Sequence, residues 1–491
     1  MLIQRAPVTG TKTTTAAEAR AARPEPLDPA LLRMGAVLTL GAILAGLDAT
    51  IVNVGIDAIA RDLHGGLSAV QWVSTGYLLA ISMVMPLSGW MTDRFGGTRM
   101  WMISVGLFVA GSALCGLAWS TSALITFRVL QGIGGGMMQP IGQSIMAQAA
   151  GPSRIGRVMS ILIIPVSFAP VIGPVLGGLI VADLDWRWMF YVNLPIGAIA
   201  LLLASRVLSK DTPHTATRAP LDVLGLALLS PGLAALVYGF AAAGGTGGFG
   251  TGRVVAALTG AAALLTAYGT HALRRRVTPL VDLRLFARRG FAAATSNSFL
   301  LGASLYSSML LLPLYDQQAR HASAIEAGFF LAPQALGTAL ASFFAGRLSD
   351  RIGARGVVLA GIGLALTGTV VFTRLGTDPA GPLLILSLLV RGVGIGTIMA
   401  PGMAAVYGSV ERHEAPRAAG ALNVVNRVGG SIGTAVFALI LQSRLGHHPA
   451  NPAAAYGDTF AWALGLTALS IIPALFFSAK PRTPAIREER T

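Results

Sequence analysis

The segment Gly89-Trp-Met-Thr-Asp93-Arg94-Phe-Gly96-Gly97-Thr-Arg99 decides the fold, because it recurs as Gly346-Arg-Leu-Ser-Asp350-Arg351-Ile-Gly353-Ala-Arg355. Each copy is a short charged turn between two long apolar stretches. A second pair of matching segments follows in the same order: Arg128-Val-Leu-Gln131-Gly132-Ile-Gly134-Gly135-Gly136 and Arg391-Gly392-Val-Gly394-Ile-Gly396. Two motifs repeated in one order predict a chain built from two halves of similar architecture.

The composition around these segments is that of a membrane protein. Of the 491 residues, 54% are hydrophobic and only 12% are charged, and the mean hydropathy is +0.67. A transmembrane helix needs about 20 mostly apolar residues, so we expect an all-α integral membrane protein with fourteen spans. The predicted spans are 34–56, 70–91, 100–118, 123–147, 158–182, 188–205, 222–242, 253–273, 290–315, 325–346, 356–375, 382–406, 418–441 and 459–479.

The distribution of basic residues predicts the orientation. With the N-terminus inside, 27 of the 36 Lys and Arg fall in the tails and in the loops of one side, as the positive-inside rule requires of the cytoplasmic side. We therefore expect a multi-pass protein of the plasma (inner) membrane with both termini cytoplasmic. The net charge of +15 is spread over many short loops rather than one face, which argues against a nucleic-acid partner.

The spans and the repeat together predict five regions. These are a disordered cytoplasmic tail (1–33), a six-helix bundle (34–206), two inserted transmembrane helices with basic cytoplasmic loops (207–289), a second six-helix bundle (290–480) and a cytoplasmic tail (481–491).

Several classes of activity are hard to reconcile with this sequence. None of the three lysines, Lys12, Lys210 and Lys480, follows a glycine, which excludes the phosphate-binding Gly-x4-Gly-Lys loop. Neither paired carboxylates nor a histidine cluster has the spacing of an enzyme or metal site, and His447 and His448 are expected to be solvated. We expect no enzyme activity, no cofactor and no metal, which leaves secondary transport of a small molecule or a channel.

The repeated motifs resemble those of the major facilitator superfamily, and further segments resemble its fourteen-helix drug:proton antiporters. Those segments are Leu47-Asp48-Ala-Thr50-Ile-Val-Asn53-Val, Pro170-Val-Ile-Gly173-Pro174-Val-Leu-Gly177-Gly178 and Trp186-Arg187-Trp188-Met-Phe190-Tyr191-Val-Asn193-Leu-Pro195-Ile-Gly197. The resemblance, which covers about 34–480, implies two six-helix bundles plus two inserted helices. It also implies a monomeric efflux transporter that exports drugs or other small lipophilic, often cationic, compounds in exchange for protons across the lipid bilayer, and thus antibiotic resistance. A dedicated exporter of one endogenous metabolite or antibiotic, and a passive facilitator, remain alternatives.

Two ionisable residues within spans are candidates for proton and substrate coupling. Asp48 lies deep in the first span, where a charged group costs about 3 kcal/mol or more, so we expect it to bind a proton or cation unless helix hydrogen bonds keep it neutral. The resemblance implies a role in proton coupling for Arg128, which would otherwise extend to the membrane surface. Whether the two residues touch is left open.

The repeated loop is predicted to be a gate. Gly89 and Gly96 would allow close backbone approach, and Asp93 could pair with an arginine or with a helix N-terminus. Such a latch would favour the outward-open state, whereas the alternative is a purely structural turn. The candidate gating residues are Gly89, Asp93, Arg94, Gly96 and Arg99.

The fifth span has a face nearly free of side chains, formed by Gly173, Gly177 and Gly178 beside Pro170 and Pro174. We expect this face to close against the other half and prevent proton leak, or to serve only helix packing.

The remaining candidates are polar residues within or beside the spans. Asp316 departs from the family pattern and is interpreted as a solvated acid at the outer end of its helix, with attraction of cationic substrates or proton release as the alternative. The candidate cavity residues are Asn53, Gln131, Asn423, Asn426 and Asp316. For Asn423 and Asn426 the alternative is hydrogen bonding between helices without substrate contact.

Overall fold

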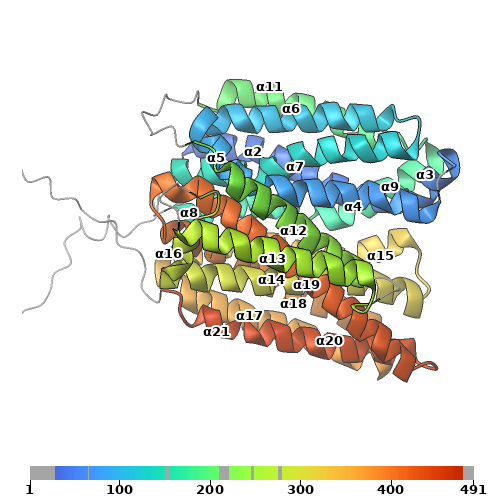
Figure 1. Ribbon diagram of the computed structural model, residues 1–491. Helices are drawn as coiled ribbons and strands as arrows, with labels where there is room; N and C mark the ends of the chain where they lie inside the picture. Colours follow the sequence, from blue (N-terminus) through green and yellow to red (C-terminus); the bar gives the residue numbers. More distant parts are fainter. Residues whose placement is uncertain are drawn as a thin grey trace, which may run out of the picture.

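The computed structural model is a bundle of helices that run side by side along one axis (Figure 1). It describes residues 28–64, 66–150, 154–209, 220–244, 248–274, 279–377 and 379–478, and within these ranges every regular element is helical. Most of the predicted N-terminal tail and the whole of the tail 481–491 lie outside the described residues. Helix α2 begins and α21 ends at the left of Figure 1, on what is called here the terminal side.

In the described residues the N-terminal half contains ten helices, and in several cases two of them are parts of one broken span. They are α2 (Pro29–Val54), α3 (Ile56–Asp62), α4 (Leu67–Val84), α5 (Leu87–Phe95), α6 (Gly97–Gly116), α7 (Thr121–Ala150), α8 (Ile155–Val166), α9 (Ala169–Asp183), α10 (Trp188–Tyr191) and α11 (Asn193–Val207).

The rest of the chain forms an inserted pair and a second half. The inserted elements are α12 (Val223–Ala243), α13 (Gly252–Arg274) and η1 (Leu283–Ala287). The second half comprises α14 (Arg289–Ala319), α15 (Ala324–Phe330), α16 (Ala332–Ile352), α17 (Ala354–Val370), η2 (Val371–Thr377), α18 (Gly381–Gly408), η3 (Arg412–Glu414), α19 (Ala415–His447), α20 (Pro452–Leu469) and α21 (Ile471–Ala474).

Fewer spans than the predicted fourteen are identified by length and apolarity. The described residues hold twelve such helices, or thirteen if α4 and α5, bent by 56° beside Pro86, form one span. The predicted span 123–147 coincides with α7, which is 30 residues long but less apolar because Arg128 and several glutamines interrupt it. The helical architecture is confirmed, whereas the number fourteen stays a prediction.

The internal repeat is visible in the backbone. Gly96 between α5 and α6 has φ of 90°, and Gly353 between α16 and α17 has φ of 88°, a conformation that glycine adopts without a steric penalty. The two matching arginines, Arg128 and Arg391, are both buried, in α7 and α18 respectively. The two halves therefore repeat the same turn and the same buried cation.

The inserted helices lie outside the two halves. Ser230 of α12 donates a hydrogen bond of 2.6 Å to the Met83 carbonyl oxygen of α4. At its other end Gly244, which follows α12, lies against Ala435 and Ala438 of α19. Helix α12 thus touches both halves, and α13 packs against α12 (Figure 1).

The two halves touch at both ends of the bundle. On the terminal side α16 packs on α8 so closely that a Cβ at Gly346 would lie 2.7 Å from the Gly156 carbonyl oxygen. On the opposite side α15 packs on α9, where a Cβ at Gly178 would lie 2.9 Å from Cγ1 of Ile325. A cavity lies between these two contacts.

Candidate functional site

The most completely buried charged pair in the described part of the chain joins α2 to α7. Nη1 of Arg128 donates to Oδ2 of Asp48 at 2.5 Å, with the two side chains 1% and 0% exposed. The other carboxylate oxygen, Oδ1, accepts from Nε2 of Gln131 at 2.9 Å and from Nδ2 of Asn193 at 3.2 Å. Asp48 is therefore paired with a cation and held by two amides.

The guanidinium of Arg128 is fixed on its other sides as well. Its Nη1 also donates to Oε1 of Gln131 at 2.8 Å, and its Nε donates to the Val73 carbonyl oxygen at 3.3 Å. The ring of Tyr77 lies 3.9 Å from the guanidinium carbon, a cation–π contact. A side chain with these contacts and 1% exposure does not extend to the membrane surface, so that alternative is wrong.

Asn193 is also a member of this cluster, although its motif alone did not predict a role for it. Besides Asp48 it binds Ser112, whose Oγ accepts from Nδ2 of Asn193 at 3.0 Å and donates to the Phe190 carbonyl oxygen at 2.9 Å. The buried Oδ1 of Asn193 has no hydrogen-bond partner in the structure. The signal that could have identified Asn193 is a buried amide at the start of an apolar helix, since such a group needs a polar partner.

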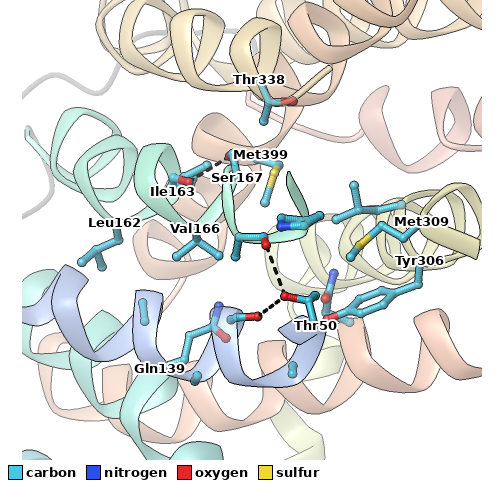
Figure 2. Close-up of a pocket in the computed structure, with 18 of the residues that line it drawn as sticks. Thr50, Gln139, Leu162, Ile163, Val166, Ser167, Tyr306, Met309, Thr338 and Met399 are labelled. Atoms are coloured by element: carbon cyan, nitrogen blue, oxygen red, sulfur yellow. Dashed lines mark hydrogen bonds between the residues drawn. The ribbon is translucent and has the colours of Figure 1, made fainter. Parts of the chain in front are cut away.

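The cavity between the halves has a volume of about 260 Å³. Figure 2 shows Thr50 and Gln139 of the first half facing Tyr306 and Met309 of the second across this space. Most of the lining is apolar, with a few polar side chains from both halves, as is usual for a small-molecule site.

Helix α2 separates the Asp48 cluster from the cavity. Ala45, Ala49 and Thr50 line the cavity, whereas Asp48 does not. Its hydrogen-bond partners Arg128, Gln131 and Asn193 all belong to the N-terminal half, to α7 and α11. The charge therefore lies inside one half, about one helix wall away from the space between the halves.

The five candidate cavity residues are distributed over several sites. Only Asn426 lines the cavity, and its Nδ2 also donates to the Ser298 carbonyl oxygen at 3.0 Å. Asn423 donates to Oε1 of Gln143 at 2.8 Å, a contact between the halves. Gln131 belongs to the Asp48 cluster, and Asn53 accepts a hydrogen bond of 3.0 Å from Ser74.

The account of Asp316 as a solvated acid is wrong. Asp316 is 3% exposed, and its Oδ1 lies 2.7 Å from Nη1 of Arg320, the residue that directly follows α14. Arg320 supplies the positive charge that a buried carboxylate requires, and it lies four residues after Asp316 in the chain.

His447 and His448, which were expected to be solvated, each have a hydrogen-bonding partner. His448 lies 3.1 Å from Oδ2 of Asp458, and His447 lies 2.7 Å from the Ser443 carbonyl oxygen. In the described ranges no group of three or more histidine, cysteine or acidic side chains could hold a metal ion.

The repeated loop reaches the second half. Oδ2 of Asp93 lies 3.1 Å from Nη2 of Arg417, which is in the first turn of α19. At Gly89 a Cβ would lie 3.1 Å from the Cα of Arg417, so any larger residue would press on this contact. Arg94 and Arg99 are exposed on the same loop. The loop thus joins the halves on the terminal side.

The glycine face of α9 divides between two partners. A Cβ at Gly173 would lie 1.9 Å from Oγ1 of Thr50, and one at Gly177 would lie 2.9 Å from the Ile51 carbonyl oxygen, both on α2. Only Gly178 packs against the second half, at Ile325. The expected closure of the whole face against the other half is therefore wrong for Gly173 and Gly177.

The prolines of this region mark a break in the span. Pro165 and Pro170 flank the break between α8 and α9, and Pro174 lies inside α9.

Comparison with known proteins identifies the family. The family model described as Major Facilitator Superfamily matches residues 38–434 and, in a second overlapping match, 294–490. The chain belongs to the Major Facilitator Superfamily. The resemblance inferred from the repeated motifs is confirmed, and because members of this superfamily are transporters, the protein is a transporter and not an enzyme.

Relatives of this superfamily protein include export proteins. A multidrug resistance protein B homolog of Mycobacterium tuberculosis is 40% identical over 433 residues, covering 86% of this chain and 78% of the relative. A tetracenomycin C resistance and export protein of Streptomyces glaucescens is 31% identical and covers 83% of this chain and 76% of that protein. These relatives are consistent with the multidrug efflux family and with a multi-pass membrane location.

A solved structure shares the superfamily fold. The proton:xylose symporter XylE superposes with a TM-score of 0.61 at 15% identity, covering 90% of this chain and 96% of the symporter. At that identity the likeness concerns the fold alone.

Proposed function

We propose that this protein is a secondary active exporter of small lipophilic compounds that exchanges substrate for protons by alternating access, with Asp48 as the proton-binding group. The observation that carries the proposal is the buried pair of Asp48 and Arg128 beside a cavity between the halves. An ionisable pair in a membrane span is a functional candidate by default. The names of the M. tuberculosis and S. glaucescens relatives support drug export.

The proposed coupling works through the charge of Asp48. An ionised Asp48 neutralises Arg128, and protonation of Asp48 removes that neutralisation. Arg128 is then a buried cation without a counter-ion, which is unfavourable by several kcal/mol, about 3–5 where such pairs are broken. Because the neighbours of Asp48 on α2, Ala49 and Thr50, line the cavity, a shift of α2 that relieves this cost also changes the substrate site.

The proposed gate is the contact of Asp93 with Arg417. If the positive-inside rule assigns the terminal side to the cytoplasm, this ion pair closes the cytoplasmic entrance and opens when the halves rock.

We also propose that the protein spans the membrane fourteen times with both termini in the cytoplasm. In this proposal it works as a monomer in the plasma (inner) membrane.

Two other functions are compatible with the same fold. A dedicated exporter of one metabolite or antibiotic is favoured by the relative named for tetracenomycin C export. A passive facilitator would need no titratable group in the membrane, and the Asp48 cluster argues against it.

The test of the proposed function is a susceptibility panel in an efflux-deficient host. The wild type should raise resistance to several lipophilic compounds, and the Asp48→Asn variant should not. Asp57→Asn is the matched control, because it makes the same change at an exposed position shortly after Asp48. Addition of an uncoupler should abolish efflux by the wild type, whereas persistent flux would indicate a facilitator. Resistance to only one compound would favour the dedicated exporter.

A further inference from the structure

The cavity between the halves carries one charged side chain, and it is a cation. Among the described residues that line it, Arg427 of α19 is the sole ionisable group that is charged at neutral pH. Asp48 directly precedes the lining residue Ala49, but it lies on the other side of α2 and is paired with Arg128. The wall of the cavity is therefore positively charged.

Arg427 is incompletely paired. Its Nη1 donates to the Tyr306 hydroxyl at 3.4 Å, whereas its Nη2 is buried and has no hydrogen-bond partner. No ion pair links it to a carboxylate in the part of the chain that the structure describes, in contrast to the pair of Arg128 and Asp48. A guanidinium left in this way offers a donor and a charge to a ligand.

A second cation, which is buried, lies behind the cavity wall. Arg391 is 2% exposed and donates to Oε1 of Gln334 at 2.5 Å, to Thr369 at 3.2 Å and to Ser308. All three partners are neutral. Gln334 itself lines the cavity. Because its oxygen accepts from Arg391, the amide group of Gln334 has its NH₂ donors left for the cavity.

The remaining lining suits an apolar body of variable shape. Met138, Met309, Met399 and Met403 contribute thioether side chains, which adapt to differently shaped ligands. The ring of Tyr306 lies on the same wall as Met309, as Figure 2 shows. The volume of about 260 Å³ is near the lower end of small-molecule sites.

We propose that the preferred substrates are amphipathic anions, in which an apolar body carries a carboxylate, sulfonate or phenolate that pairs with Arg427, with Gln334 as a second donor. This inference rests on the proposed export function for its physiological meaning and names the substrate class of the same site. It is opposite in sign to the preference for lipophilic cations that the family resemblance implied. A cationic substrate would be repelled by Arg427 and by the field of Arg391. No carboxylate among the described lining residues would compensate for that repulsion.

The test uses two probes with the same ring and opposite charge, 2-naphthylacetate and (2-naphthylmethyl)trimethylammonium. Binding to the full-length protein in lipid nanodiscs is measured by titration calorimetry. The wild type should bind the carboxylate at least about tenfold more tightly than the ammonium ion. Arg427→Gln should weaken carboxylate binding by a similar factor and leave or improve ammonium binding. Arg427→Lys should retain most of the preference, because the charge remains.

Arg444→Gln is the matched control, since it removes the same charge from the same helix outside the cavity. It should leave both affinities unchanged. Tighter binding of the ammonium ion by the wild type, failure of the carboxylate to bind at millimolar concentration, or equal losses for both probes in Arg427→Gln would overturn the inference. The wild-type preference decides the matter even if a variant fails to fold.

Binding is measured at equilibrium without a proton gradient, so the result does not depend on whether transport is coupled to protons. Carboxylate preference together with gradient-independent transport would refute proton coupling and keep the substrate class. Proton-coupled export together with tighter binding of the ammonium ion would refute the substrate class and keep proton coupling.

Discussion

Arg128 and Asp48 are eighty residues apart in the chain and form a 2.5 Å ion pair that is almost completely removed from solvent. The pair joins α2 to α7 within one half, while the next residues of α2 line the cavity between the halves. A change in the charge of either partner therefore acts on a helix that both the ion site and the substrate site share.

The first prediction concerns the cost of leaving one partner alone. Asp48→Asn should destabilise the folded protein by about 3–5 kcal/mol, because Arg128 is then a buried cation without a counter-ion. The double variant Asp48→Asn/Arg128→Gln should recover much of that loss, since no buried charge is left. The melting temperatures of the purified proteins provide the measurement. Equal melting temperatures of the single and double variants would argue against the ion pair.

The second prediction concerns the gate on the terminal side. Asp93→Asn, Arg417→Gln and the double variant should all change the transport rate to a similar extent with little change in substrate affinity, because either substitution breaks the same contact. The interaction free energy of Asp93 and Arg417 should be small, about 0.2–1 kcal/mol for a partly exposed pair, so the change in rate should be modest. Initial rates over a range of substrate concentrations measure it, with exposed Arg206→Gln as the control. A change in affinity alone would contradict a gating role.

The third prediction concerns the contact of α9 with α2. Gly173→Ala should destabilise the protein by about 1–3 kcal/mol, because the added Cβ would lie 1.9 Å from Oγ1 of Thr50 and the helices would have to separate. Gly106→Ala is the control, since a Cβ there meets nothing within 4 Å. Thermal unfolding should show a loss for the first variant and none for the second. An unchanged melting temperature for Gly173→Ala would mean that α9 does not pack on α2 as described.

The fourth prediction concerns pH at the starts of α14 and α19, outside the spans. Arg288 donates hydrogen bonds of 2.7 and 2.8 Å to Glu414, and these lower the pKa of the Glu414 carboxyl below its usual value of about 4.3. The stabilisation is therefore complete above about pH 4.3 and is lost as the pH falls through the lower folded-state pKa. Because Arg288 is 44% exposed, it amounts to at most about 1 kcal/mol.

The melting temperature of Arg288→Gln relative to the wild type tests this prediction. The difference should be constant between pH 5 and 8 and should shrink below about pH 4 as Glu414 is protonated. A difference that instead increased toward low pH would assign the opposite sign to the interaction.

Much of the fold could be predicted because hydropathy and repetition are local properties. Glycines at the turn positions, Gly96 and Gly353, marked the two halves before any contact was known. The predicted span 123–147 coincides with α7, although α7 is too polar to be identified as a span by the apolarity of the helix alone.

The site was less predictable because its contacts join distant segments. Asp48 and Arg128 were both chosen as candidates, but their pairing depends on how α2 and α7 face each other, which no local pattern contains. Asp316 was misjudged because its burial arises from packing of α14, and the role of Arg427 in the cavity depends on side chains from both halves. Charge on a cavity wall is a property of the assembled bundle.

The most direct test of the account is the transport of substrate by reconstituted vesicles with and without an imposed pH gradient. Uptake of a compound from the susceptibility panel is measured for the wild type and Asp48→Asn, together with exchange of labelled for unlabelled substrate without a gradient. The account predicts that the variant loses gradient-driven uptake and retains exchange. Full gradient-driven uptake by Asp48→Asn would contradict it.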